Sequence, residues 1–337
     1  MKAMILKSHA MIEYNPLQLT DVEIPEPGPD EVLIKVLCCA VCRTDIHVIE
    51  GDLNPSTMPV IPGHQATGVV TKVGRHCNFI SVGDWVGVAW LGRTCGTCIY
   101  CQTDKENLCL QPQFTGYNLQ GGYSEYMVAA EKFVYPLPKD ANQFQISPLL
   151  CAGIVGYRAL KRSNFELGQH LLLIGFGSSA HLMLQLVVAQ GGKVSVVTRA
   201  KNHQKLALEL GAVWAGDSTA DLSETVDCAI LFAPAGDLVP QTLSALKRGG
   251  TLAVAGIHLS PIPQLEYETH LFYERDLRSV TANTRHDGVE FLQKAFQYNI
   301  LPKVQIYRLQ DANKALLDLK MDRINGTAVL SMPDSDY

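Results

Sequence analysis

Short apolar runs alternate with stretches of helical character between residues 171 and 255. The apolar runs, which predict strands, lie at 171–174, 194–197, 226–231 and 251–255. The stretches between them that predict helices include 180–189 and 201–210. This order of strand and helix is typical of an α/β domain in which helices cover a doubly wound parallel sheet.

The chain on either side of this region has a different character. Residues 32–36 predict a strand after a proline-rich turn, and glycines and short apolar runs continue to about residue 135, which indicates a β-rich domain. A chain of 337 residues is long enough for two cores. We therefore expect one domain from residues 1–153 and 285–337, and a second from residues 154–284.

The composition narrows the class of protein. Hydrophobic residues make up 47% of the chain and charged residues 18%, with a formal net charge of −5, as is typical of a soluble globular enzyme. The scattered basic residues argue against a nucleic-acid partner. No apolar run reaches the roughly 18 residues of a membrane span, and residues 1–14 do not resemble a signal peptide. Ten cysteines without an export signal indicate a reducing compartment, so we expect a cytoplasmic protein with no membrane partner.

Four cysteines follow one another in the pattern Cys-x2-Cys-x2-Cys-x7-Cys. They are Cys95, Cys98, Cys101 and Cys109. Thiolates separated by such short loops can surround one tetrahedral ion, and four sulfurs form the closed shell of a structural zinc. Four unrelated reduced thiols are the alternative, which this spacing disfavours. We expect a zinc-bound lobe over about residues 90–112, with no open position for a substrate.

A glycine-rich turn directly follows the first strand of the alternating region. Gly175, Gly177 and Ala180 form the pattern Gly-x-Gly-x-x-Ala between that strand and the next helix. The first glycine permits a tight turn, the second lets the backbone approach a pyrophosphate, and the small third residue lets helix and strand pack closely. An ordinary strand-to-helix turn is the alternative, but the order of strand, turn, helix and strand favours a dinucleotide site.

The end of the second strand bears on the choice of cofactor. An acidic residue about 20 positions after the first glycine normally binds the ribose 2′-hydroxyl of NAD. This chain has Thr198, Arg199 and Lys201 there instead. No carboxylate at that position repels a 2′-phosphate, and Arg199 can pair with one. We therefore expect NADP(H) rather than NAD(H); the alternative is that Arg199 is a solvated surface charge.

Three further possible metal ligands are far apart in the sequence. They are Cys42, His64 and Cys151. Two thiolates and one imidazole with an open fourth position form a known catalytic zinc arrangement. Taken singly, each residue has a simpler interpretation, because buried cysteines often behave as small hydrophobic residues and a histidine can be satisfied within a turn.

These motifs occur together in the order of one family. The chain resembles the zinc-dependent alcohol dehydrogenases of the medium-chain dehydrogenase/reductase superfamily, from residues 2–4 to residues 326–330. The resemblance implies a Rossmann cofactor domain, a barrel-like catalytic domain, and hydride transfer between a primary alcohol or aldehyde and a nicotinamide. It also implies two zinc ions per chain, a catalytic one on Cys42, His64 and Cys151 and a structural one in the lobe. Relatives are dimers or tetramers, so we expect a homo-oligomer.

The same resemblance implies roles for the residues that follow Cys42. Thr44 contacts the substrate oxygen, and His47 passes the proton to solvent, a task that suits the histidine pKa of ~6.5. Asp45 orients a metal-bound histidine, and Arg43 contacts the cofactor pyrophosphate. Without the resemblance, Arg43, Thr44 and His47 are ordinary residues of a helix surface.

Some positions depart from the family pattern. Gln65 replaces the glutamate that usually follows the ligand histidine, so the site has one negative charge fewer and we expect a bound substrate hydroxyl to be more acidic. Many relatives carry an arginine near Thr327 that this chain lacks, so we expect other groups, Arg285 or Arg199, to bind the phosphates. Trp90 matches a pocket-wall position, and Leu53 lies where some ethanol-selective relatives have a second tryptophan, which predicts a roomier pocket.

Two other functions compete with this one. A zinc-free quinone or enoyl reductase of the same superfamily typically lacks the set of Cys42, His64 and Cys151, which this chain has. A non-catalytic NADPH-binding or structural protein has no need of an intact ligand set. Zinc content separates the three functions, because we expect two ions per chain for the alcohol dehydrogenase and one or none for the others.

Overall fold

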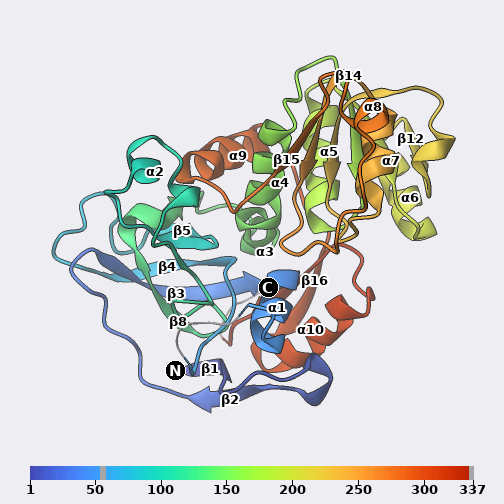
Figure 1. Ribbon diagram of the computed structural model, residues 1–337. Helices are drawn as coiled ribbons and strands as arrows, with labels where there is room; N and C mark the ends of the chain where they lie inside the picture. The colour runs from blue at the N-terminus through green and yellow to red at the C-terminus, as the bar shows by residue number, and fades with distance from the viewer. Residues whose placement is uncertain (54–57, 334–337) are drawn as a thin grey trace. The chain divides into compact units, whose positions relative to one another are not determined.

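The computed structural model describes residues 1–53 and 58–333, and the chain divides into two compact units (Figure 1). The first unit comprises Met1–Cys151, Asn283–Val289 and Leu301–Tyr337, and the second comprises Ala152–Ala282 and Glu290–Ile300. The sequence expectation gave all residues from 285 onward to the first domain, whereas the structure groups residues 290–300 with the second unit. The assignment of the two units as catalytic and nucleotide-binding domains stays a prediction.

A parallel sheet of six strands forms the second unit, in the order β12-β11-β10-β13-β14-β15. Its strands are β10 (His170–Ile174), β11 (Lys193–Val197), β12 (Trp214–Gly216), β13 (Val226–Leu231), β14 (Leu246–Val254) and β15 (Asp276–Ser279). The first strand lies in the middle and the chain winds outward from it in both directions, which is the Rossmann order. The predicted α/β class is therefore confirmed.

The helices of this unit alternate with its strands. They are α4 (Ala152–Arg162), α5 (Ser178–Ala189), α6 (Lys201–Glu209), α7 (Leu238–Ala245) and α8 (Tyr267–His270). Figure 1 shows α5, α6 and α7 alongside the strands that they connect. All five residues of β10 are buried, as is typical of a central parallel strand with helices packed against the sheet. Helix α9 (Arg285–Gln297) begins in the first unit and continues into the second, where its Phe291 ring lies 5.9 Å from the ring of Tyr157.

A mostly antiparallel sheet of seven strands forms the centre of the first unit, in the order β16-β17-β3-β4-β5-β9, with β8 also paired to β3. Its strands are β3 (Glu31–Ala40), β4 (Ala66–Val73), β5 (Trp85–Val88), β8 (Tyr126–Ala130), β9 (Val134–Pro136), β16 (Val304–Arg308) and β17 (Thr327–Ser331). Strand β3 pairs with β4, β8 and β17, so three distant parts of the chain meet on the strand that leads to Cys42.

Smaller elements complete this unit. They are the paired strands β1 (Lys2–Leu6) and β2 (Leu17–Asp21), the paired strands β6 (Leu91–Arg93) and β7 (Gln113–Phe114), and the helices α1 (Arg43–Glu50), α2 (Ile99–Gln102), α3 (Gln143–Ile146) and α10 (Ala312–Lys320). Buried apolar residues of β1, β3, β4, β5, α1 and α10 form one core cluster beneath the sheet. Among the residues that the structure describes, no helix is long and apolar enough to cross a membrane.

Candidate active site and metal centres

Cys42 lies at the point where β3 passes into helix α1. Its backbone N–H donates to Asp45 Oδ2 at 2.8 Å, which caps the first turn of the helix. The helix N-terminus favours a negative charge, so this position stabilises the Cys42 thiolate. Thr44 and Asp45 are buried on the inner side of the same turn, whereas Arg43 faces outward.

His64 is held from one side by Asp45 and faces the sulfurs with the other. Its Nδ1 lies 3.0 Å from Asp45 Oδ1, and its Nε2 lies 3.3 Å from Cys151 Sγ. A proton on Nδ1 that is donated to Asp45 leaves the lone pair of Nε2 directed at the cysteines, which is the arrangement of a metal-binding histidine. The ring is completely buried, so this orientation is fixed.

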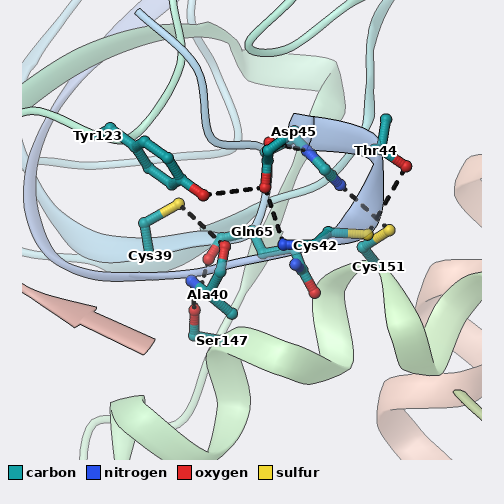
Figure 2. Close-up of polar contacts among 10 residues, drawn as sticks. Cys39, Ala40, Cys42, Thr44, Asp45, Gln65, Tyr123, Ser147 and Cys151 are labelled. Atoms are coloured by element: carbon teal, nitrogen blue, oxygen red, sulfur yellow. Dashed lines mark hydrogen bonds and ion pairs between the residues drawn. The ribbon is translucent and has the colours of Figure 1, made fainter. Parts of the chain in front are cut away.

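Cys151 follows the short 3-10 helix Ser147–Leu150 and completes the group. The ligand atoms of Cys42, His64 and Cys151 all lie within 4.8 Å of one another. Figure 2 shows the sulfurs of Cys42 and Cys151 pointing toward each other. Among residues 1–53 and 58–333, no further histidine, cysteine or carboxylate joins this group. The structure therefore brings together three donors that sequence spacing alone could not connect.

The protonation of these residues shows how the site accepts a cation. A hydrogen bond from Cys151, helped by His64, holds the pKa of Cys42 well below its usual value, despite burial. The same hydrogen bond and burial raise the pKa of Cys151. Burial alone lowers the pKa of His64, but the Asp45 carboxylate and Cys42 raise it to about 10. A divalent cation would displace protons from His64 and Cys151, and two thiolates with one imidazole fit zinc.

The four cysteines of the lobe also converge. Their sulfurs lie within 4.8 Å of one another, with separations of 3.5 Å between Cys95 and Cys109, 3.6 Å between Cys98 and Cys101, and 3.9 Å between Cys95 and Cys101. A tetrahedron with Zn–S bonds of about 2.3 Å has sulfurs about 3.8 Å apart. Backbone N–H groups of Thr97 and Cys98 lower the pKa of Cys95 to about 6, which favours the thiolate. The donor set fits a closed zinc site.

The predicted relay residues lie along α1. The Thr44 hydroxyl is buried and lies 3.6 Å from the Cys42 sulfur. His47, one turn later, is partly exposed, and its Nδ1 lies 2.8 Å from Asp52 Oδ2. Thr44 is therefore near the ligand cluster and His47 nearer to solvent. Their roles in proton transfer stay predictions.

Gln65 is buried directly after His64. Its backbone carbonyl accepts hydrogen bonds from the Ala40 N–H at 3.0 Å and from the Ser147 hydroxyl, as Figure 2 shows. Ser147 also accepts from the Ala40 N–H at 2.7 Å. These contacts join the chain segments that carry Cys42, His64 and Cys151. No local pattern in the sequence indicated that Ser147 would join these segments, because a single serine before a proline is typical of an ordinary turn.

Trp90 and Leu53, the predicted pocket residues, have different surroundings. The Trp90 ring meets the His64 ring edge-on, with 4.9 Å between their centroids, and stacks on Phe114 at 4.8 Å. The structure thus places Trp90 beside a metal-ligand candidate. Leu53 is half-buried, and its N–H donates to the His47 carbonyl at 3.0 Å, so it lies at the end of α1.

The glycine-rich turn has the backbone that its pattern predicted. Gly175 has a φ of +85°, which side chains rarely adopt, and Gly177 precedes the first turn of α5. Ala180 is completely buried. Because Ile174 of β10 pairs with Val197 of the parallel strand β11, the turn shares one sheet edge with the residues that follow β11.

Those residues are the predicted cofactor contacts. The backbone N–H of Thr198 donates a hydrogen bond to the Gly216 carbonyl at 2.8 Å, which fixes the position of the residue. Arg199 is exposed, and Lys201 lies 3.8 Å from Asp217. Arg43, by contrast, forms an ion pair with Asp322. Its predicted contact with a pyrophosphate therefore has to compete with a carboxylate that the sequence did not reveal as a neighbour.

Comparison with known proteins identifies the family. A family model described as the alcohol dehydrogenase GroES-like domain matches residues 28–139. The probable alcohol dehydrogenase AdhA of Mycobacterium tuberculosis (strain CDC 1551 / Oshkosh) is 45% identical over 335 residues, which cover 98% of this chain and 97% of that protein. The chain belongs to the medium-chain alcohol dehydrogenase family. The resemblance inferred from the sequence is confirmed, and oxidoreductase activity of the alcohol dehydrogenase type follows from it.

Two further comparisons, one with a sequence and one with a solved structure, support this assignment. An alcohol dehydrogenase of Geobacillus stearothermophilus is 34% identical, with 94% of this chain and 96% of that protein covered. The crystal structure of CAD from Helicobacter pylori complexed with NADP(H) has a TM-score of 0.87 and 25% identity, and both chains are covered completely. The similarity extends over the whole length, so both units belong to the shared fold.

Proposed function

We propose that this alcohol dehydrogenase interconverts primary alcohols and aldehydes with NADP(H), and that it uses zinc held by Cys42, His64 and Cys151. The observation that carries the proposal is the convergence of these three donors, with the imidazole oriented by Asp45. A set of three protein donors leaves one position for a substrate oxygen. Zinc bound there supplies Lewis-acid chemistry, which polarises a carbonyl and favours loss of the hydroxyl proton from an alcohol.

The protein residues around this site handle the proton and the substrate. The Thr44 hydroxyl, close to the Cys42 sulfur, takes up the proton of the alcohol as it gives up its own. His47, whose ring Asp52 orients, passes the released proton toward solvent. Trp90, which packs against the His64 ring, forms one wall of the pocket, and Leu53 leaves room for larger substrates. Aliphatic and aromatic primary alcohols are the expected substrate class.

The cofactor-binding residues favour the phosphorylated nicotinamide, which accepts or donates the hydride when bound. Gly175, Gly177 and the N-terminus of α5 bind the pyrophosphate, and Arg199 pairs with the 2′-phosphate. The proteins of similar structure include complexes with NADP(H) and with NAD, so the choice rests on the residues of this chain. Thr198, Arg199 and Lys201 leave no carboxylate at the position where NAD enzymes hold the ribose.

The remaining predictions concern the molecule as a whole. The lobe cysteines bind a second, structural zinc that no substrate reaches. The first unit acts as the catalytic domain and the second as the cofactor domain. A cytoplasmic homo-oligomer is expected. The reductase and non-catalytic alternatives lose support because the three ligand atoms lie close together, which neither function requires.

A screen of primary alcohols and aldehydes with both cofactors tests the proposal. We expect turnover with a 10- to 100-fold higher kcat/KM for NADP(H) than for NAD(H), because a charge-assisted bond to the 2′-phosphate contributes about 1.5–3 kcal/mol. The matched variant Arg199→Ala should lower the ratio toward one without changing kcat for NAD(H). Equal use of both cofactors by the wild type contradicts the NADP(H) proposal, and a lack of turnover with every substrate contradicts the enzyme function.

A further inference from the structure

Tyr123 contacts the carboxylate that orients His64. Its hydroxyl donates to Asp45 Oδ2 at 2.9 Å, and Figure 2 shows the phenol pointing directly at that carboxylate. Tyr123 is completely buried, and Asp45 is 1% exposed, so neither group has access to water. In the sequence, Tyr123 follows two glycines, and nothing in that pattern indicates a contact with Asp45.

The Asp45 carboxylate has three donors in fixed positions. Oδ1 faces His64 Nδ1, while Oδ2 accepts from the Cys42 N–H and the Tyr123 hydroxyl. Two of these partners belong to the proposed ligand residues themselves. The third, Tyr123, comes from another part of the chain and provides a further hydrogen bond to a buried charge. Such a buried acceptor is costly to leave unfilled.

The Tyr123 ring is itself fixed beside His64. The Tyr123 N–H donates to the Pro62 carbonyl at 3.0 Å, and its carbonyl accepts from the Met4 N–H at 2.8 Å. The ring passes over Gly63, where an added Cβ would lie only 2.3 Å from a ring carbon. Gly63 has a φ of +96°, so both its conformation and the space above it require glycine. The segment 61–64 is thereby clamped against Tyr123.

We propose that Tyr123 is a positioning residue for the metal centre, which acts through Asp45 to hold the His64 imidazole in its metal-binding orientation. The inference rests on the proposed function, because it requires that Cys42, His64 and Cys151 bind zinc. Outer partners of this kind change metal affinity 10- to 100-fold when they are removed. A tyrosine that served only as packing would be replaced by phenylalanine without such an effect.

Tyr307 provides a matched control within the same unit. It is 7% exposed, and its hydroxyl donates to Asp318 Oδ2 at 3.0 Å, far in sequence from the proposed ligands. Tyr123→Phe and Tyr307→Phe each remove one tyrosine–aspartate hydrogen bond and keep the ring. A general loss of stability affects both variants, whereas a loss of metal positioning affects only Tyr123→Phe.

The experiment measures the release of zinc from the full-length holoenzyme to a chromogenic chelator, and the visible spectrum after exchange with Co²⁺. Zinc release from two sites gives two kinetic phases, and the phase that is missing in Cys42→Ser belongs to the ion of the proposed catalytic site. We expect Tyr123→Phe to release that ion 10- to 100-fold faster and to alter the Co²⁺ spectrum, while the lobe ion and Tyr307→Phe behave as in the wild type. Equal rates of zinc release from the two phenylalanine variants would overturn this inference but not the proposed function.

Two further outcomes are informative. If Tyr123→Phe does not fold because the buried Asp45 carboxylate loses a donor, Asp45→Asn removes that charge and its cost. The double variant Asp45→Asn/Tyr123→Phe is then compared with Asp45→Asn. Equal zinc retention supports action through Asp45, and an additional loss in the double variant overturns it. If Cys42→Ser removes no ion at all, the metal site itself is wrong, and the proposed function is overturned together with this inference.

Discussion

The two sulfur-rich centres of the first unit are built in different ways. The lobe takes all four donors from residues 95–109, and backbone N–H groups stabilise its thiolates. The other centre draws Cys42, His64 and Cys151 from three separate segments, and a buried carboxylate orients its imidazole. Four donors close the first centre, while three leave a position open in the second. The centre that we propose to be reactive therefore takes its donors from distant segments and depends on neighbouring side chains for its geometry.

The largest effect is expected from breaking the open centre. Cys42→Ser removes one thiolate, so kcat for alcohol oxidation should fall by about 10³-fold or more, since a Lewis acid contributes several kcal/mol to the transition state. Steady-state kinetics and zinc per chain measure this. Cys77→Ser, which changes a partly buried thiol outside both centres, is the control and should retain both zinc and turnover. Normal turnover of Cys42→Ser would remove the distinction between the centres.

A smaller effect on turnover is expected from opening the lobe. Cys98→Ser should release the lobe ion and destabilise the lobe, about residues 90–112, by on the order of 4 kcal/mol, because loss of a metal is among the most disruptive single changes. Hydrogen exchange of the lobe measures this, with kcat recorded in parallel. A loss of kcat equal to that of Cys42→Ser, with the lobe still protected, would contradict a purely structural role.

The smallest effect is expected from adding one negative charge near each centre, which tests how strongly each responds to a neighbouring charge. Gln65→Glu adds a buried negative charge next to His64, which opposes ionisation of a bound hydroxyl and should raise the pH of half-maximal alcohol oxidation by about one unit. Gln111→Glu adds the same charge at an exposed residue whose N–H lies 3.4 Å from Cys109 Sγ, where solvent screens it. An unmoved pH profile for Gln65→Glu would show that the missing glutamate has no electrostatic consequence.

Sequence patterns predicted those elements that a short stretch of the chain defines by itself. The strands at 170–174, 193–197 and 226–231 consist mostly of apolar residues, and the glycines of the turn after the first strand lie close together in the sequence. Both features could therefore be predicted from the sequence. The strands at 214–216 and 276–279 were not predicted, because they are short and only partly buried, and neighbouring strands rather than their own composition define them.

The residues of the open centre could not be grouped together from local sequence patterns. Cys42, His64 and Cys151 were joined in advance only through the family resemblance, since nothing in their spacing brings them together. The contact of Tyr123 with Asp45 and the ion pair of Arg43 with Asp322 were missed altogether. Both depend on segments that meet only when the antiparallel sheet is complete, and a lone tyrosine or aspartate carries no signal of its distant partner.

The pairing of β17 with β3 joins two segments that are separated in the sequence by the parallel-sheet unit. During translation, the ribosome delivers β17 only after the strands of the parallel sheet, β10 to β15. That unit can therefore fold first, while the nascent β3 still lacks one neighbour and exposes unpaired backbone groups. The first unit therefore completes its sheet only after the second unit has been synthesised.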